Sequence, residues 1–178
     1  MWAFVDSEKV EKVYTKPTAI TVGDNQYPAN VMTLWSDAQL KGIGVYRVIV
    51  DNSKKKDPAY YINTNQTFAF ASNKVKATYG TATAKDLDTL KKEHKEVITN
   101  QAYGLLQPND WLVVRKQEAG TAIPSDWTTF RTGVRTASAS MKSKIDAVSD
   151  VDALAALYVY NDANPPVRPL GEFPTAPE

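Results

Sequence analysis

The chain contains no cysteine and one histidine, His94. The absence of cysteine excludes disulfides, thiolate nucleophiles and cysteine-ligated metals. A single histidine excludes a histidine-based metal cluster and argues against a Ser-His-Asp triad. His94 also falls on the apolar side of a helical pattern, which favours a partly buried structural histidine. Together with the lack of a distinctive carboxylate pair and of a phosphate-binding loop, these absences lead us to expect no metal site, no cofactor and no enzymatic activity.

Long apolar runs are also absent. No stretch approaches the roughly 18 apolar residues of a membrane span. The first residues, MWAFVDSEKVEKV, lack the basic start and apolar run of a signal peptide. We expect that the chain does not insert into a membrane. We also expect that it is synthesised in the cytoplasm.

Positive and negative charges are nearly balanced, since the chain has 21 Lys and Arg and 20 Asp and Glu. This balance predicts no nucleic-acid partner. The one basic run, Lys54-Lys55-Lys56, lies among turn residues and is expected to be a solvated loop tip. The phosphate-binding glycine motifs are missing as well, because Gly42-Ile43-Gly44 lacks a third glycine and precedes a strand pattern.

Acidic residues are plentiful, but no spacing singles out a catalytic pair. Asp110 and Asp126 each stand before a tryptophan at the start of a helical pattern. Aspartate is preferred at helix N-caps, so we expect both residues to be caps.

The first 80 residues alternate apolar and polar side chains over short runs separated by turn residues. Such alternation predicts strands, and short turns predict antiparallel pairing with one buried face and one wet face. The expected strands are 1–5, 9–14, 19–22, 45–50, 60–63, 67–71 and 74–79. Ser36 is expected to cap a short helix over 37–41, which Gly42 and Gly44 end. The candidate core is aromatic: Trp2, Phe4, Trp35, Tyr46, Phe68 and Phe70.

After Gly80 the apolar residues recur at spacings of three and four, which predicts helices. The apolar face of the first helix is expected to comprise Leu87, Leu90, His94, Val97, Ile98, Ala102 and Leu105. Pro108 ends this helix, and a short helix 111–118 follows before Gly120. The next helix begins at Pro124-Ser125-Asp126, and its expected apolar stripe is Trp127, Phe130, Val134, Ala137, Met141, Ile145 and Val148. Its flanks are expected to carry Arg131, Arg135, Lys142 and Lys144.

A last short helix is expected over 151–158, capped by Ser149-Asp150. The proline-rich sequence from Asn161 onward cannot be helical and is too short to form a domain, so it must lie extended along a surface or hang free. On that basis, deleting 164–178 is expected to leave the melting temperature nearly unchanged and to weaken partner binding. The predicted class is α+β: an antiparallel β-rich domain (1–81), a helical domain (84–158) and an extended C-terminal tail (159–178).

Two segments carry a resemblance to a known family. The first, 106–141, contains Asp110-Trp111, Arg115, Glu118-Ala119-Gly120, Ile123-Pro124, Trp127, Arg131 and Arg135; the second is Glu172-Phe173-Pro174-Thr175-Ala176-Pro177. Together they resemble the C-terminal half of tailed-bacteriophage tail-fibre assembly proteins, which have a Trp-led helix with arginines at this kind of spacing and an acidic-aromatic-Pro-x-x-Pro tail. Phe173 stands where tryptophan is commoner. The opening β unit, with Tyr27-Pro28, Trp35-Ser36 and Gly44-Val45-Tyr46, resembles the N-terminal parts of marine-phage tail proteins.

The resemblance implies a phage tail protein that binds the tail fibre or baseplate in the virion tail and is made in the host cytoplasm. The first 80 residues match the assembly chaperones less well, so both a retained virion component and a transient assembly factor stay open, as does homo-oligomerisation. The expected partner-binding residues are Trp127, Arg131, Arg135, Phe173 and Pro174. Arginine and tryptophan are frequent interface hot spots, although Trp127 also suits a core position and the arginines suit a solvated flank.

Two other functions remain possible from the sequence. The β unit, with its many aromatics, would suit a carbohydrate-binding module of the host-recognition apparatus. A depolymerising enzyme is the third alternative. A stable complex with a fibre from the same genome, without affinity for host polysaccharide, would favour the tail-protein hypothesis over the carbohydrate module.

Overall fold

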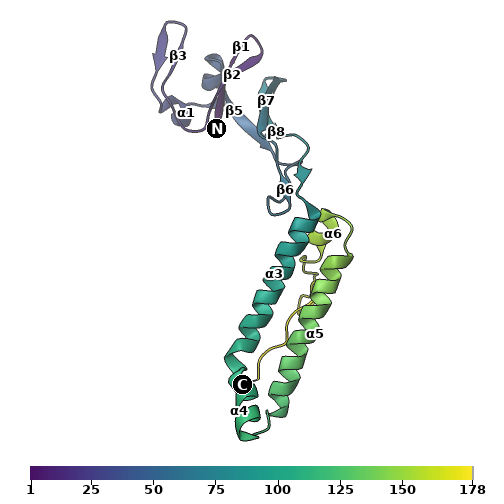
Figure 1. Ribbon diagram of the computed structural model, residues 1–178. Helices are drawn as coiled ribbons and strands as arrows, with labels where there is room; N and C mark the ends of the chain where they lie inside the picture. Colours follow the sequence, from purple (N-terminus) through teal and green to yellow (C-terminus); the bar gives the residue numbers. More distant parts are fainter. Residues whose placement is uncertain (178) are drawn as a thin grey trace. The chain divides into compact units, whose positions relative to one another are not determined.

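The computed structural model describes residues 1–177 and divides into two compact units, Met1–Thr83 (unit 1) and Ala84–Glu178 (unit 2) (Figure 1). Residue 178, the last of the expected tail, lies outside the described residues. Strands fill the N-terminal part and helices follow, so the predicted α+β class is confirmed.

Unit 1 is built from short strands and two short helices. Their bounds are β1 Trp2–Asp6, β2 Lys9–Tyr14, β3 Ile20–Val22, β4 Asn25–Tyr27, α1 Val31–Leu34, α2 Asp37–Gly42, β5 Val45–Asp51, β6 Tyr61–Ile62, β7 Gln66–Ala71 and β8 Lys74–Tyr79, with β9 Thr83–Ala84 at the boundary. The single turn α1 was not predicted, because one turn is too short to show a helical period.

Five strands form the main sheet of unit 1, in the order β2-β1-β5-β8-β7. The pairs β1–β2 and β7–β8, which short turns connect, are antiparallel as predicted, and the pair β1–β5 is antiparallel as well. The pair β5–β8 is parallel, so the expectation of a wholly antiparallel unit is wrong. The reason is the long connection from Asp51 to Lys74, which brings the chain back to the end of the sheet where β5 began.

Two hairpins fix the register of this sheet. Each has a two-residue loop, Ser7-Glu8 between β1 and β2 and Ser72-Asn73 between β7 and β8. All four loop residues have positive φ, between 47° and 64°. This is the backbone of a type I′ turn, whose twist matches that of the paired strands.

The core of unit 1 covers both faces of strand β1. Trp2 and Phe4 pack on a cluster formed by Ile20, Val31, Met32, Leu40 and Val45. Ala3 and Val5 point the other way and are buried with Val75. The six aromatics expected in the core are only half-buried, whereas the fully covered residues are aliphatic. A unit of this size has too little depth to enclose rings that large.

The helix α2 begins as predicted. The Ser36 side chain accepts a hydrogen bond from the Gln39 backbone N–H, and the Gln39 side chain accepts one from the Ser36 N–H, which completes a capping box. Gly44 follows the helix with a φ of +74°, and a Cβ there would lie 2.9 Å from the Val5 carbonyl oxygen. Glycine therefore permits β5 to start close against β1.

Unit 2 is an arrangement of helices with a non-helical C-terminal segment. The helices are α3 Leu87–Leu106, the 3₁₀ turn η1 Gln107–Asn109, α4 Trp111–Ala119, α5 Ser125–Ala147 and α6 Val151–Ala156. The helices α3 and α5 lie side by side, and the chain after α6 runs between them (Figure 1). Asp86 and Asp150 cap α3 and α6 by accepting from the Thr89 and Ala153 backbone N–H groups.

The apolar faces of α3 and α5 follow most of the predicted stripe. The buried residues are Leu90, Ile98 and Ala102 on α3 and Phe130, Val134, Met141 and Ile145 on α5. Val97 is the exception, because its side chain is 52% exposed. At 3.6 residues per turn it lies about 80° from the centre of the α3 stripe, which places it at the rim of the buried face.

The C-terminal tail lies along its own helices. Leu170 is 1% exposed, and Phe173 packs against Ala102, Phe130 and Val134. The Lys144 ammonium donates to the backbone carbonyl oxygens of Pro169 (2.7 Å) and Leu170 (3.1 Å). The tail therefore lies along a surface of its own chain. A deletion of 164–178 is now expected to lower stability, contrary to the prediction from the sequence.

Candidate interaction surface

Arg131 is a buried structural residue, contrary to the expected solvated flank and partner contact. Its side chain donates to the Leu106 carbonyl oxygen (3.1 Å), to Asn109 Oδ1 and to Asp110 Oδ1 (2.7 Å), and it is 5% exposed. These acceptors lie where α3 ends before Pro108, and the Asp110 N–H, the usual helical donor to the Leu106 carbonyl, donates to the Gln107 carbonyl instead. The guanidinium therefore joins α5 to the α3–α4 junction.

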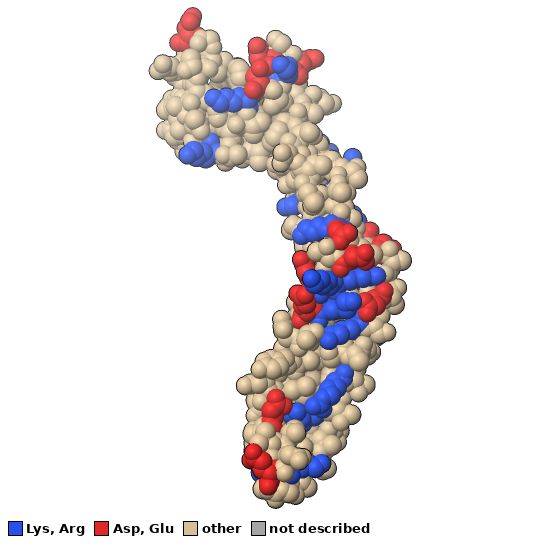
Figure 2. All heavy atoms as spheres, in the orientation of Figure 1, with Lys and Arg blue, Asp and Glu red and all other residues tan. Residues whose placement is uncertain are grey.

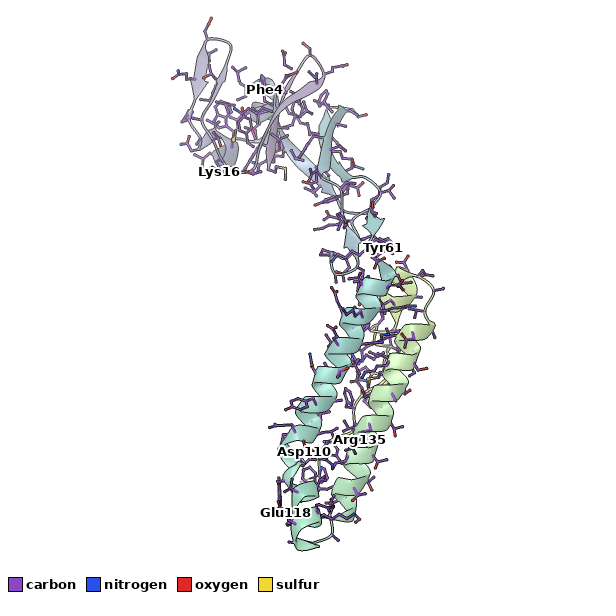
Figure 3. The ribbon with its side chains drawn as sticks, viewed as in Figure 1. Phe4, Lys16, Tyr61, Asp110, Glu118 and Arg135 are labelled. Carbon is purple, nitrogen blue, oxygen red and sulfur yellow. The ribbon has the colours of Figure 1, made fainter. Side chains whose placement is uncertain are left out.

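Asp110 is correspondingly not the side-chain cap that the sequence suggested. The N-terminus of α4 has no side-chain cap hydrogen bond, and the carboxylate pairs with Arg131 instead. Figure 3 places Asp110 at the α3–α4 junction. The Asp126 carboxylate accepts from the neighbouring Trp127 N–H, and Asp126 itself lies inside the first turn of α5, whose N-cap residue is Pro124.

Trp127 and Phe173 meet at one apolar cluster. Trp127 is half-buried, and its ring meets Phe130 edge to face at 5.8 Å between centroids. Phe173 reaches the same cluster from the tail. Pro174 lies over Gly133, where an added Cβ would be 3.2 Å from Pro174 Cγ. The structure thus brings together the Trp-led helix and the aromatic-proline tail.

Arg135 is the expected contact residue that remains on the surface. It lies on the exposed side of α5, one turn after Arg131, and its Nη1 donates to the Arg131 carbonyl oxygen at 3.3 Å (Figure 3). Most of its donors are left for water or a partner.

A groove runs along α5 beside the tail. Its volume is about 790 Å³, and it is lined by Thr128, Thr129, Thr132, Gly133, Thr136, Ala137, Ser140, Glu172, Phe173 and Pro174. The helix side of the groove carries only small and hydroxyl side chains, so its backbone is closely approachable. The tail side supplies a ring and one carboxylate.

Other exposed apolar residues were not expected to be contacts. Tyr103 is 66% exposed, Trp111 is 56%, Val113 is 44% and Val114 is 51%. The sequence held one signal for them, since the 18-residue stretch from Val97 to Val114 contains a single charged residue, Asp110. Figure 2 shows the charged side chains gathered instead over the end of unit 2 nearest α6.

The tail is fastened by Arg168 and Glu172. The Arg168 Nε lies 2.8 Å from Glu172 Oε1, and its guanidinium carbon lies 5.7 Å and 5.4 Å from the ring centroids of Tyr158 and Tyr160. Tyr160 donates to the same carboxylate at 2.6 Å, and this hydrogen bond raises the pKa of its phenol. The ion pair and the two rings hold the chain as it turns back toward α3 and α5.

His94 has the structural role that the sequence suggested. Its Nδ1 lies 2.6 Å from the Tyr158 hydroxyl, and the two rings are 4.8 Å apart at an angle of 49°. Burial lowers the pKa of His94, while the Glu93 carboxylate opposes part of that effect. Within residues 1–177, His, Cys, Asp and Glu do not form any group of three or more that would hold a metal ion.

Comparison with protein-family models, with curated proteins and with solved structures gives no match. A search of the helices of residues 1–177 finds none that is long and apolar enough to cross a membrane.

Proposed function

We propose that the chain is a bacteriophage tail protein that binds the tail fibre or baseplate, as a retained virion component or as a fibre assembly factor. One observation carries the proposal. The two segments that resemble tail-fibre assembly proteins, the Trp-led helix and the Glu-Phe-Pro tail, pack against each other through Phe173, Pro174 and Gly133. Two resemblances at distant places in the sequence thus belong to one structural feature.

The groove beside this feature is the proposed contact surface. It is open along α5, and its small side chains allow another backbone to approach closely. Phe173 and Pro174 form its apolar wall, and Arg135 supplies an exposed charge on the same helix. An unpaired strand or loop of a fibre tip has the backbone donors and acceptors that the threonine and serine hydroxyls would meet.

The test is co-purification with the fibre or baseplate protein of the same phage genome. Thr136→Glu places a charge in the groove and is expected to weaken the complex at least about tenfold, since a buried unpaired charge opposes binding. Ser143→Glu is the matched control, because Ser143 is exposed on the same face of α5 two turns further on and does not line the groove.

The outcomes separate the functions considered. A complex that forms equally well with both variants contradicts the groove as the contact surface. Binding to purified host polysaccharide, in the absence of any fibre complex, would favour the carbohydrate-binding module. The aromatic residues once expected to serve such a module pack on the core of unit 1, so no observation at present favours it.

A further inference from the structure

The helix α4 is almost uncovered. Leu112 is its one buried residue, and Trp111, Val113 and Val114 are between 44% and 56% exposed. A nine-residue helix that turns three large apolar side chains to water gains little from folding unless another surface covers them.

One face of α4 combines apolar and charged side chains. Trp111, Val114, Arg115 and Glu118 occupy positions i, i+3, i+4 and i+7, so they form a strip about 100° wide. We call this strip the α4 face. Leu112, the residue that anchors the helix, points about 110° away from its centre.

The charges of the α4 face form no ion pair within residues 1–177. The Arg115 guanidinium carbon lies 4.8 Å from the centroid of the Trp111 ring, and its buried Nε has no hydrogen-bond partner among the described residues. Glu118, further along α4 (Figure 3), forms no ion pair with any residue in 1–177. Glu118 is exposed, so its carboxylate is open to a cation from outside the chain.

We propose that the α4 face binds the α4 face of a second copy of this chain, with the two helices antiparallel about a two-fold axis. An axis between Val114 and Arg115 sets Trp111 opposite Glu118 of the second copy. Arg115 leans back over Trp111, so its guanidinium comes to the level of that carboxylate, about 5 Å along the helix from the axis. Each copy then contributes its Arg115 to one ion pair and its Glu118 to the other, and the two Val114 side chains lie beside the axis.

The strength of this contact follows from its size. Stable interfaces bury about 1,200–2,000 Å² in total, and two helices of this length bury less. We therefore expect a dissociation constant of about tens of micromolar. The two ion pairs mainly fix the antiparallel orientation, since exposed charges contribute more to specificity than to affinity. The inference is independent of the proposed function, because the groove lies on α5.

Sedimentation velocity of the full chain tests the proposal, over roughly 5 to 500 µM to span the expected constant. Wild type is expected to shift from monomer to dimer. Arg115→Glu and Glu118→Arg should each remain monomeric, because like charges then face each other. An equimolar mixture of these two variants should dimerise again, because every facing pair is then opposite in charge. Trp111→Ala should weaken association about tenfold.

The control is Lys92→Glu, an equal charge reversal at an exposed residue of α3 remote from α4 in sequence. It should dimerise as wild type does. Circular dichroism checks that each variant keeps its helices. If Arg115→Glu disturbs α4, the test rests on Trp111→Ala and Glu118→Arg, because these two side chains are exposed. A wild-type chain that stays monomeric throughout overturns the proposal, and so does a mixture that associates no better than its components.

Discussion

Arg131 is the residue on which the end of the α3–α5 pair depends. A charged group buried with three acceptors is costly to lose, since its removal leaves the acceptors unsatisfied. We expect Arg131→Met to lower the free energy of unfolding by about 2–3 kcal/mol, a value reduced from the fully buried case because Asp110 is 54% exposed. Arg135→Met, one turn away on the surface, should change it by less than about 0.5 kcal/mol. Urea unfolding followed by helical circular dichroism measures both, and equal effects would contradict the buried network.

This role of Arg131 was not visible in the sequence for a physical reason. Its acceptors belong to residues 21 to 25 positions earlier, and only the tertiary fold brings them to the guanidinium. An arginine beside an apolar stripe has the same local pattern whether it is solvated or buried. Phe173 and Pro174 were predictable as a motif, whereas their docking site on α5 was not.

His94 gives stability a dependence on pH. Burial lowers its pKa in the folded state below the ordinary value of 6.5, so the unfolded chain binds a proton more readily. This contribution to stability is complete above the unfolded pKa and is lost as the pH falls from about 6.5 through the folded pKa. We expect His94→Gln to flatten the fall in the free energy of unfolding between about pH 7.5 and 5. An unchanged pH profile in urea titrations would contradict the lowered pKa of the half-buried His94.

At the scale of elements, the sequence pattern correctly predicted the features that depend on neighbouring residues. Alternation in β8 buries Val75 and Ala77 and exposes Lys74 and Lys76, as expected. The caps at Ser36 and Asp150 were also correct, because they depend on contacts within three residues. The parallel pairing of β5 with β8 was missed, since strand partners are chosen by the packing of the whole unit.

The close approach of the tail to α5 predicts an energetic coupling. Gly133→Ala should stabilise α5 by about 1 kcal/mol through helix propensity, but its Cβ would press on Pro174 Cγ at 3.2 Å. In a chain that keeps Pro174, we expect Gly133→Ala to change the free energy of unfolding by nearly zero. In a chain that carries Pro174→Ala, we expect Gly133→Ala to raise it by about 1 kcal/mol. Gly104→Ala is the control, because nothing lies within 4 Å of its added Cβ. Equal gains at Gly133 in both backgrounds, by double-mutant cycle, would disprove the contact.

The tail as an element should contribute to the stability of unit 2. Leu170→Ala removes a side chain that is 1% exposed and should cost about 2–4 kcal/mol. Val167→Ala, at a side chain that is 51% exposed, should cost less than about 0.5 kcal/mol. Deletion of 164–178 should lower the melting temperature by roughly 10 °C or more. A deletion that leaves the melting temperature unchanged would mean that the tail does not hold its place on α3 and α5.

At the scale of the whole molecule, each unit has apolar clusters of its own. Those of unit 1 are formed by residues from Trp2 to Val75, and the Phe130 cluster of unit 2 by residues from Ala102 to Phe173. A segment that buries its own core can fold alone, although units of this size have little stability to spare. We therefore expect fragments 1–83 and 84–178, produced separately, each to unfold in one cooperative thermal transition. The first should have a strand-type and the second a helical circular dichroism spectrum. A fragment with a spectrum of unfolded chain would show that its core is incomplete without the other unit.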